Sequence, residues 1–231
     1  MAQELCLVCG GSAFEHTPIL WSSLIREWEL DEGEAEYIDI QQGTHCVACG
    51  SNVRSMALAG AIMRWKGFRG TLASFVNDPR YRELRILEIN EAGSLHPVLK
   101  RLSQHRLVTY PAFDMTDAAL PSRSVDLVVH SDTLEHVADP LQGLRECRRL
   151  VADNGAVIFT VPTVIGRLSR SRSTLPPSYH GQPEAELRDP AMKVHTEFGA
   201  DVWTYVIRAG FASCELLAFR FPSGIAIVAR P

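Results

Sequence analysis

The segment that decides the fold spans residues 125–162 and reads VDLVVHSDTLEHVADPLQGLRECRRLVADNGAVIFTVP. It opens with a short apolar run, VDLVVH, and closes with a second one, AVIFTV. Between these runs, DPLQGLRECRRLV carries apolar residues at helical spacing, and DNG marks a tight turn. The segment therefore predicts a strand, a helix and a second strand, the repeating unit of a mostly parallel sheet.

The same alternation extends to both sides of this segment. Four further runs of strand length are LRILEI, RLVTY, CELLAF and IAIVAR, and two further helix candidates are SLHPVLKRLSQ and ADVWTYVIRAG. Strands that alternate with helices predict an α/β fold with a doubly wound, mostly parallel sheet. Only RFPSG separates the last two strand candidates, so we expect a hairpin that places one antiparallel strand in the sheet.

Composition limits the classes of protein and partner. The chain has 231 residues, 46% hydrophobic and 22% charged, which suits one medium-sized domain with a small appendage. Its net charge of −4 counts against nucleic acid as a partner, because surfaces that bind nucleic acid are basic. MAQELCLVCG lacks the pattern of a secretory signal, and no apolar run reaches the length of a membrane span. We expect a cytoplasmic protein with no membrane partner, and its oligomeric state stays open.

Two cysteine pairs share one pattern, CLVCG at 6–10 and CVACG at 46–50. Each has CxxC spacing followed by glycine, so that two thiolates can bind one ion in front of a tight turn. Reducing conditions disfavour disulfides, so the pairs together predict a structural zinc site. Its four ligands are Cys6, Cys9, Cys46 and Cys49. Two redox dithiols or buried free thiols are the alternatives, and we expect Cys147 and Cys214 to be core residues.

Changes of pattern along the chain predict three parts. Residues 1–53 form the zinc-binding segment, with a helix in ILWSSLIREWEL and a loop or second helix in DEGEAEYIDI. Residues 54–83 form connecting helices that begin with RSMALAGAIMRW, and residues 84–231 form the main domain. Within that domain, residues 163–199 show no regular pattern and follow a strand, so we expect a lid loop there.

The first strand of the main domain ends at a candidate ligand site. In LEINEAGSLHPVL, Glu88 lies inside the strand, and Gly93 occupies a turn that leads into a helix. Ser94 is a natural N-cap, and Pro97 falls in the first helical turn. Ligands bind open α/β sheets beyond the carboxyl ends of the strands, so this turn predicts the floor of a pocket for a small polar ligand.

ILEINEAGSL, together with the run from FDMTDAALPS to FTVP, resembles the class I S-adenosylmethionine-dependent methyltransferases of the methyltransferase-11 type. The resemblance covers residues 84–162 in detail. It implies a Rossmann-like methyltransferase fold, S-adenosylmethionine as cofactor, and Asp114 at the adenine amine with Met115 over the adenine ring. The alternative for Asp114 is an aspartate that only stabilises the turn in DMTD. The cofactor-binding residues that it implies are Glu88, Asn90, Ala92, Gly93, Asp114, Met115, His130 and Ser131.

The chain departs from the family pattern at two places. Where the family has a glycine-rich turn, this chain carries Asn90, Ala92 and Ser94, and Gly93 is displaced by one position. Asn tolerates the left-handed region and Ala adds one methyl group, so we expect a pocket of altered geometry. The stretch from Asn90 to Asp126 is also short, and no acidic residue follows RLVTY to hold the ribose.

The strand VDLVV leads to the candidate catalytic residues. Asp132 and His136 are spaced to share one face of a helical turn, and His136 is the candidate general base because imidazole titrates near working pH. An architectural role for Glu135 and His136 is the alternative. In the ubiquinone-pathway O-methyltransferases a similar run is associated with a divalent ion, a role that the resemblance extends to Asp132, Glu135 and His136.

The lid carries further candidates. Arg167, Arg170 and Arg172 suit a clamp on a phosphate or carboxylate, with a solvated basic loop as the alternative. His180 and His195 are alternative bases, and the substrate-contact candidates also include Tyr179 and Glu197.

These observations favour methyl transfer to a small-molecule acceptor. We expect this acceptor to be a secondary metabolite or a sugar-type molecule, and anionic molecules are included in this class. A ribosomal-RNA methyltransferase is one alternative, disfavoured by the acidic charge balance. A fold member that binds a ligand without transferring methyl groups is the other, because the glycine turn is eroded and a fold does not dictate chemistry.

Overall fold

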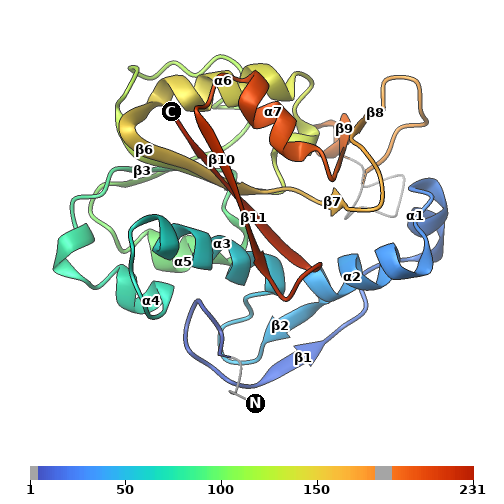
Figure 1. Cartoon of the computed structure of the whole chain (residues 1–231), viewed down its shortest axis with the longest axis horizontal. Coiled ribbons are helices and arrows are strands. Elements are labelled where there is room, and N and C mark those ends of the chain that lie inside the picture. The colour runs from blue at the N-terminus through green and yellow to red at the C-terminus, as the bar shows by residue number, and fades with distance from the viewer. Residues whose placement is uncertain (1–4, 180–188) are drawn as a thin grey trace.

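The computed structural model describes residues 5–179 and 189–231. Its centre is a six-stranded sheet with strand order β10-β11-β6-β5-β3-β4 (Figure 1). The strands are β3 (Ile86–Ile89), β4 (His105–Val108), β5 (Val125–Ser131), β6 (Val151–Thr160), β10 (Ser213–Phe219) and β11 (Gly224–Arg230). The first four are parallel, whereas β11 runs antiparallel to both β6 and β10. All six predicted strands are present, and the expected antiparallel strand is β11.

Helices cover both faces of this sheet, which confirms the doubly wound α/β prediction. Figure 1 shows α3, α4 and α5 on one face, and α6 and α7 on the other. Their bounds are α3 (Val53–Trp65), α4 (Leu72–Phe75), α5 (His96–Leu99), α6 (Pro140–Leu150) and α7 (Val202–Arg208). Short 3₁₀ turns complete the chain at η1 (Pro79–Tyr81), η2 (Gly93–Leu95), η3 (Leu134–His136) and η5 (Pro190–Met192).

Local sequence explains where the long helices begin. Asn52 caps α3 by accepting a hydrogen bond from the backbone N–H of Ser55, and Asp139 caps α6 in the same way. Pro140 occupies the first position of α6, where its missing N–H costs nothing. The predicted helix over residues 94–104 is shorter than expected, because a 3₁₀ turn replaces its first residues and α5 ends at Leu99.

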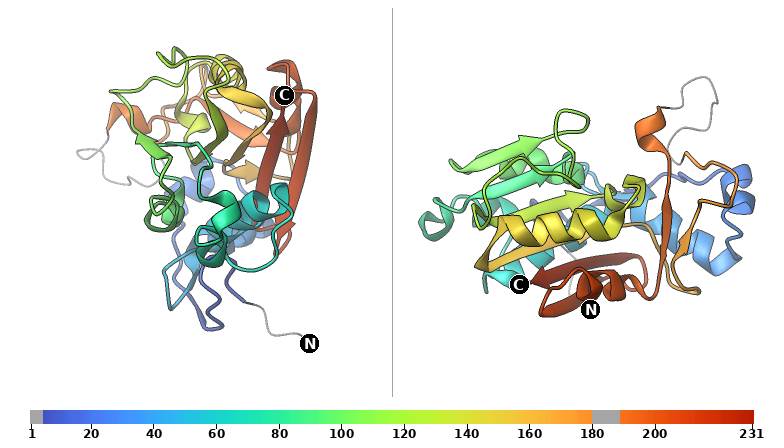
Figure 2. Two further views of the ribbon diagram at one scale, coloured as in Figure 1. Left: turned by 90° about the vertical axis from the view of Figure 1, so that its left-hand side faces the viewer. Right: turned by 90° about the horizontal axis from the view of Figure 1, so that it is seen from above.

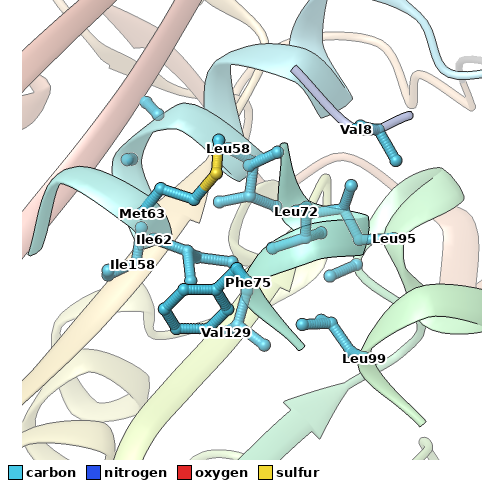
Figure 3. Close-up of a cluster of buried hydrophobic side chains, with 14 of the residues drawn as sticks. Val8, Leu58, Ile62, Met63, Leu72, Phe75, Leu95, Leu99, Val129 and Ile158 are labelled. Carbon is cyan, nitrogen blue, oxygen red and sulfur yellow. The ribbon is translucent and has the colours of Figure 1, made fainter. Parts of the chain in front are cut away.

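The described residues form three buried hydrophobic clusters, one on each face of the sheet and a smaller one that joins α1 and α2 to Val164 and Val194. The layer under α3 joins buried side chains of α3, α4, α5 and the sheet, among them Leu58, Phe75 and Val129 (Figure 3). Val8, from the N-terminal cysteine segment, packs into the same layer. The N-terminal segment therefore shares a hydrophobic core with the sheet.

The N-terminal segment contains a two-stranded ribbon and two helices. β1 (Phe14–His16) pairs with β2 (Thr44–Cys46), and between them lie α1 (Ser22–Glu27) and α2 (Glu32–Gly43). The acidic run DEGEAEYIDI is a helix, because Asp31 and Glu34 form a reciprocal capping box at its start. Of the two conformations left open by the sequence, the helix is the one observed.

The stretch 163–199 differs from the prediction. Instead of lacking regular structure, it forms a small three-stranded sheet of β7 (Thr163–Val164), β8 (Arg170–Ser171) and β9 (Thr196–Gly199) in the order β7-β9-β8. Strands of two to four residues are too short for the alternation of apolar residues to reveal. In both Figure 1 and the view from above in Figure 2, the described residues around β8 lie beside α1. The helices of the described ranges include none with the length and apolar character needed to cross a membrane.

Candidate active site and cysteine cluster

The four predicted zinc ligands form one cluster, with their sulfur atoms all within 4.8 Å of one another. The Sγ atoms of Cys6 and Cys49 are 3.7 Å apart, as are those of Cys9 and Cys46. Each of these close contacts joins a cysteine of one CxxC pair to a cysteine of the other pair, which disfavours two separate dithiols. Four Zn–S bonds of about 2.3 Å at tetrahedral angles need S–S edges of about 3.8 Å, so the donor set fits zinc.

Glycines close the turn behind each cysteine pair. Gly10 donates its N–H to the carbonyl oxygen of Cys6, and Gly50 donates to that of Cys46, both at 2.8 Å. φ is 87° at Gly10 and 71° at Gly50, a region that favours glycine. The sequence pattern and the backbone thus agree on two tight turns of the same form, one at each cysteine pair.

The turn that follows β3 is left-handed at three positions. φ is 57° at Asn90, 49° at Glu91 and 57° at Gly93. The side chain of Asn90 stabilises this conformation, because its Oδ1 accepts the N–H of Tyr110 at 2.9 Å. The turn therefore adopts the positive φ angles that glycine favours, although only one of its three positive-φ residues is glycine.

Glu88 fixes the same turn from inside the sheet. Its side chain is fully buried, and Oε1 accepts the N–H of Ala92 at 2.7 Å. Oε2 lies 2.8 Å from Nδ1 of His96 and 2.6 Å from Nε2 of His105. Burial alone would raise the pKa of Glu88, but the hydrogen bonds from His105, Ala92 and His96 outweigh it and lower that pKa. Although these side chains are close enough to share a metal, their hydrogen bonds already account for the arrangement.

The cysteine segment supports the turn from the other side. Ser94 donates its N–H to Oγ of Ser55 at 3.3 Å, and its Oγ lies 2.9 Å from Oγ of Ser51. Ser51 Oγ is in turn 3.2 Å from Sγ of Cys49. A Cβ added at Gly93 would lie 2.8 Å from Ser55 Oγ. A chain of hydrogen bonds thus connects a predicted zinc ligand to the predicted cofactor turn.

The carboxyl end of β5 brings two predicted cofactor residues to this edge. Ser131 Oγ lies 2.8 Å from Oγ1 of Thr160. The same Ser131 Oγ would lie 3.7 Å from a Cβ atom added at Gly93. His130 is completely buried, and its ring stacks on Phe159 with centroids 4.9 Å apart. Neither ring nitrogen of His130 has a hydrogen-bond partner in the described structure, and burial lowers its pKa to about 3.

Asp132 forms an ion pair with Arg54 of α3. Both side chains are largely buried; burial raises the pKa of Asp132, and the positive charge of Arg54 opposes that rise. Within the described part of the chain, Oδ1 of Asp132 and Nε of Arg54 have no hydrogen-bond partner. Unpaired polar atoms here, at the edge where β3 and β5 end, fit a small polar ligand such as S-adenosylmethionine.

His136 ends the short turn η3. Its Nδ1 lies 3.2 Å from the carbonyl oxygen of Lys193, which can only accept, so in the neutral ring Nδ1 carries the proton. The other ring nitrogen, Nε2, lies 3.7 Å from Oε1 of Glu135. Burial, together with the nearby His195, lowers the pKa of His136, so the ring is neutral near pH 7. Burial and the charge of Asp132 raise the pKa of Glu135 well above its ordinary value.

The divalent-ion prediction for this run does not fit the geometry. Among the described residues, the ligand atoms of Asp132, Glu135 and His136 do not converge as those of the four cysteines do. The Asp132 carboxylate binds Arg54 instead. The expected helical turn is not formed, because only Glu135 and His136 lie in the 3₁₀ turn η3, whereas Asp132 precedes it with a positive φ of 46°.

Asp132 and His136 line a cavity of about 230 Å³. Its remaining walls are mostly apolar and come from α1, its flanking residues, α2 and the chain after β6. These walls are Ile19, Leu20, Trp21, Leu24, Trp28, Leu30, Ile38, Gln42, Pro162 and Met192. The cavity thus lies between the N-terminal segment and the carboxyl ends of β5 and β6.

The arginines of the lid do not form an anion clamp in this structure. Arg167, Arg170 and Arg172 all bind the buried carboxylate of Glu197. Arg170 also binds Glu29 at 2.6 Å. Glu197, expected to contact substrate, is therefore the anchor of β8 and β9 against α1.

The other predicted residues have varied positions. Asp114 is exposed and accepts the N–H of Thr116 at 2.8 Å, whereas Met115 is 5% exposed and packs against Gly143 of α6. The backbone N–H of His195 donates to the carbonyl oxygen of Glu135 at 2.7 Å, and its ring does not line the cavity. Tyr179 is half-buried outside the cavity wall, and His180 lies outside the described residues.

Sequence reasoning missed Arg54 and the aromatic wall of the cavity. A lone arginine within the apolar helix RSMALAGAIM was a usable signal, because a buried guanidinium needs a partner. Trp21 and Trp28 gave no such signal, since their position depends on how α1 packs against a segment more than a hundred residues away.

The comparisons with known proteins agree with this geometry at the level of the family. Residues 78–159 match the family described as a methyltransferase domain. No curated protein matches the chain.

Several solved structures are similar to the chain. A proposed O-methyltransferase from Nostoc punctiforme PCC 73102 is 17% identical, with 77% of this chain and 57% of that one covered and a TM-score of 0.42. The CMeT domain of the citrinin polyketide synthase is 12% identical, with 91% and 59% covered and a TM-score of 0.48. A SAM-dependent methyltransferase from Aquifex aeolicus is 12% identical, with 68% and 95% covered and a TM-score of 0.39. The chain thus spans less than two thirds of the length of the first two.

The strand order, the turn after β3 and the family match over residues 78–159 lead to one assignment. Residues 78–159 form a methyltransferase domain, and the chain carries a cluster of four cysteines near its N-terminus.

Proposed function

We propose that the chain transfers the methyl group of S-adenosylmethionine to a small molecule that binds in the cavity between α1 and the sheet. The observation that carries this proposal is the position of Asp132 and His136 in the wall of that cavity. They lie beyond the carboxyl end of β5, the edge at which open α/β sheets bind their ligands.

The proposed cofactor site lies at the ends of β3 and β5. Gly93 and Ser131 lie close together there, and Arg54 offers an unpaired Nε nearby through its pairing with Asp132. Asp114 and Met115 are proposed to hold the adenine, as the family resemblance implies. When bound, S-adenosylmethionine supplies an electrophilic methyl group on a positively charged sulfur.

His136 is the proposed general base. A neutral imidazole whose Nδ1 proton is directed to a backbone carbonyl presents Nε2 as a proton acceptor. Its position in the cavity wall is what supports this role over that of His195. The main contribution of the chain to the rate is then the alignment of the acceptor with the methyl group.

The proposed role of zinc is structural. A site with four thiolate ligands has no open position for chemistry. The hydrogen bonds from Cys49 through Ser51 to Ser94 support a role in holding the cofactor turn. We further propose the three-part organisation, 1–53, 54–83 and 84–231, as a functional division, although Val8 packs into the shared core.

Methyl transfer itself tests the proposal. The purified zinc-loaded chain is incubated with S-adenosylmethionine and a panel of small molecules, and products are identified by mass spectrometry. We expect His136→Gln to lower kcat by about 10²–10⁴-fold and to leave the affinity for S-adenosylhomocysteine unchanged. A variant as active as the parent chain would remove His136 from the mechanism.

A further inference from the structure

The cavity next to His136 has a wall of aromatic and aliphatic side chains. Trp21, Leu24 and Trp28 contribute from α1 and its two flanking positions, and Pro162 and Met192 close the opposite side. Indole rings are large, rigid apolar surfaces that favour stacking against other rings. The wall is therefore suited to a flat, apolar molecule.

The volume limits the size of this molecule. At about 230 Å³, the cavity is smaller than the pockets of about 300–1,000 Å³ that hold drug-sized ligands. A cavity of about 150 Å³ is enough to hold a benzene molecule. One ring or two fused rings fit this range, and a nucleotide-linked sugar does not.

Charge excludes anionic acceptors. Among the described residues that line the cavity there is no lysine or arginine. Arg167, Arg170 and Arg172, which follow the lining residue Pro162 in the chain, bind Glu197 instead. A phosphate or carboxylate in this cavity would lose its hydration without gaining a cation, which is strongly unfavourable.

The polar end of the cavity selects the reacting group. Asp132, His136 and Gln42 are its polar lining residues. A neutral imidazole is a weak base, so it assists best when the acceptor proton is already acidic. A phenolic hydroxyl, with a pKa of about 10 as in tyrosine, meets this requirement far better than an aliphatic alcohol or a sugar hydroxyl.

We propose that the acceptor is a one- or two-ring phenol, which lies against Trp21 and Trp28 with its hydroxyl directed to His136. This inference rests on the proposed methyl transfer and names its substrate class. The phenolic proton passes to Nε2 of His136 and then to solvent. The phenolic oxygen forms a new bond to the methyl carbon as the S–CH₃ bond breaks, and the electron pair of that bond stays on sulfur. The products are an aryl methyl ether and S-adenosylhomocysteine.

Calorimetric titration of the zinc-loaded chain, with S-adenosylhomocysteine present, tests this substrate class. The probes are 2-naphthol and glucose 1-phosphate. The variant is Trp21→Ala. The Trp21 side chain makes no capping hydrogen bond to α1, so its removal takes no such bond away from the helix. The matched control is Trp203→Ala, which removes a 47% exposed tryptophan from α7, outside the cavity wall.

We expect 2-naphthol to bind and glucose 1-phosphate not to bind. Trp21→Ala should weaken 2-naphthol binding by about tenfold or more, as loss of an aromatic anchor does, whereas Trp203→Ala should have no effect. Both variants should bind S-adenosylhomocysteine like the parent chain. With S-adenosylmethionine, mass spectrometry should detect 2-methoxynaphthalene.

Several results would overturn the inference. Binding of glucose 1-phosphate in place of 2-naphthol would do so, and so would equal effects of the two tryptophan substitutions. Binding of 2-naphthol without a methylated product would reject phenols as the acceptor. If S-adenosylhomocysteine binds and 2-naphthol does not, only the substrate class fails; if S-adenosylhomocysteine does not bind, the proposed function fails with it.

Discussion

At the scale of single residues, the turn after β3 shows how side-chain contacts can replace glycines. Asn90 and Glu91 adopt positive φ, which costs about 1–3 kcal/mol for each non-glycine residue. The hydrogen bonds from Tyr110 to Asn90, from Ala92 to Glu88 and from Ser94 to Ser55 offset that cost. The turn is therefore held by its surroundings, which the eroded glycine motif alone does not reveal.

Gly93 is the position at which this turn has no spare room. A Cβ there would lie 2.8 Å from Ser55 Oγ, so Gly93→Val should displace the turn and abolish the thermal stabilisation by saturating S-adenosylhomocysteine. Gly67→Val is the matched control, because Gly67 also has positive φ but a Cβ there meets no atom within 4 Å. Both variants should lose about 1–3 kcal/mol through backbone strain. Equal ligand stabilisation in the two variants would show that the turn is not part of the cofactor site.

The pH dependence of the reaction tests the role of His136. A base must be neutral, and burial lowers the pKa of His136 below its ordinary value of about 6.5. Protonation at lower pH removes the base, so the acid limb of the kcat profile should fall below about pH 6.5 and be absent in His136→Gln. An acid limb that the variant retains would assign the titration to another group.

The sequence indicated part of this site at residue level. It named Asp132 and His136, which meet in one cavity wall, because a strand end followed by polar residues is a local pattern. It did not indicate Arg54 as the partner of Asp132, or Trp21 and Trp28 as walls, because these contacts are set by the packing of distant elements. Roles at Asp114 and Met115 stay predictions.

At the scale of elements, Glu197 organises the stretch after β6. Its buried carboxylate binds three arginines, at positions 167, 170 and 172, and so joins β8 to β9. Removal of one charge from a buried network leaves the others uncompensated. Together with Glu27 and Glu29 at α1, Glu197 gives these three arginines three carboxylate partners, so the solvated basic loop that was the alternative expectation is not observed.

Replacement of Glu197 should destabilise the chain strongly. Glu197→Gln removes the buried anion that Arg167, Arg170 and Arg172 share and leaves Arg170 and Arg172 only their outer partners Glu29 and Glu27. We therefore expect a loss of about 3–5 kcal/mol in urea unfolding and faster proteolysis of residues 163–175. The control is Glu215→Gln, whose carboxylate is 38% exposed and pairs with Arg64 and Arg230 at the surface. That change should cost less than about 1 kcal/mol. Similar losses in both variants would mean that the network contributes little.

The sequence predicted the long elements better than the short ones. The six strands of the main sheet are four to ten residues long and carry continuous apolar runs, which is a strong signal. β7 and β8 have two residues each, and their pairing with β9 depends on Glu197 and on the packing of α1. Short strands of this kind are set by tertiary contacts.

At the scale of the whole molecule, the cysteine segment contributes to both the core and the site. Cys6 and Cys46 are fully buried in the same hydrophobic layer as α3, and the residues after Cys49 contact the cofactor turn. The N-terminal segment also supplies most of the cavity wall. Metal binding, folding and substrate binding should therefore be coupled.

Loss of one cysteine tests this coupling. Cys46→Ser should abolish stoichiometric zinc binding, lower Tm by about 2–4 °C for each kcal/mol lost, and weaken S-adenosylhomocysteine binding. Cys214→Ser, outside the cluster, should retain the metal. Metal content by mass spectrometry and thermal unfolding measure these effects. A folded, zinc-free Cys46→Ser chain with full ligand affinity would contradict the proposed structural role.

The most direct test of the central claim is calorimetric titration of the zinc-loaded chain with S-adenosylhomocysteine. The claim is that a turn with one glycine, held by Glu88, Asn90 and Ser94, still forms a cofactor site. We predict binding at a single site, weakened by about tenfold in Asp114→Ala through loss of a hydrogen bond to the adenine amine. Absence of binding by the parent chain, with S-adenosylmethionine as well as S-adenosylhomocysteine, would contradict the account.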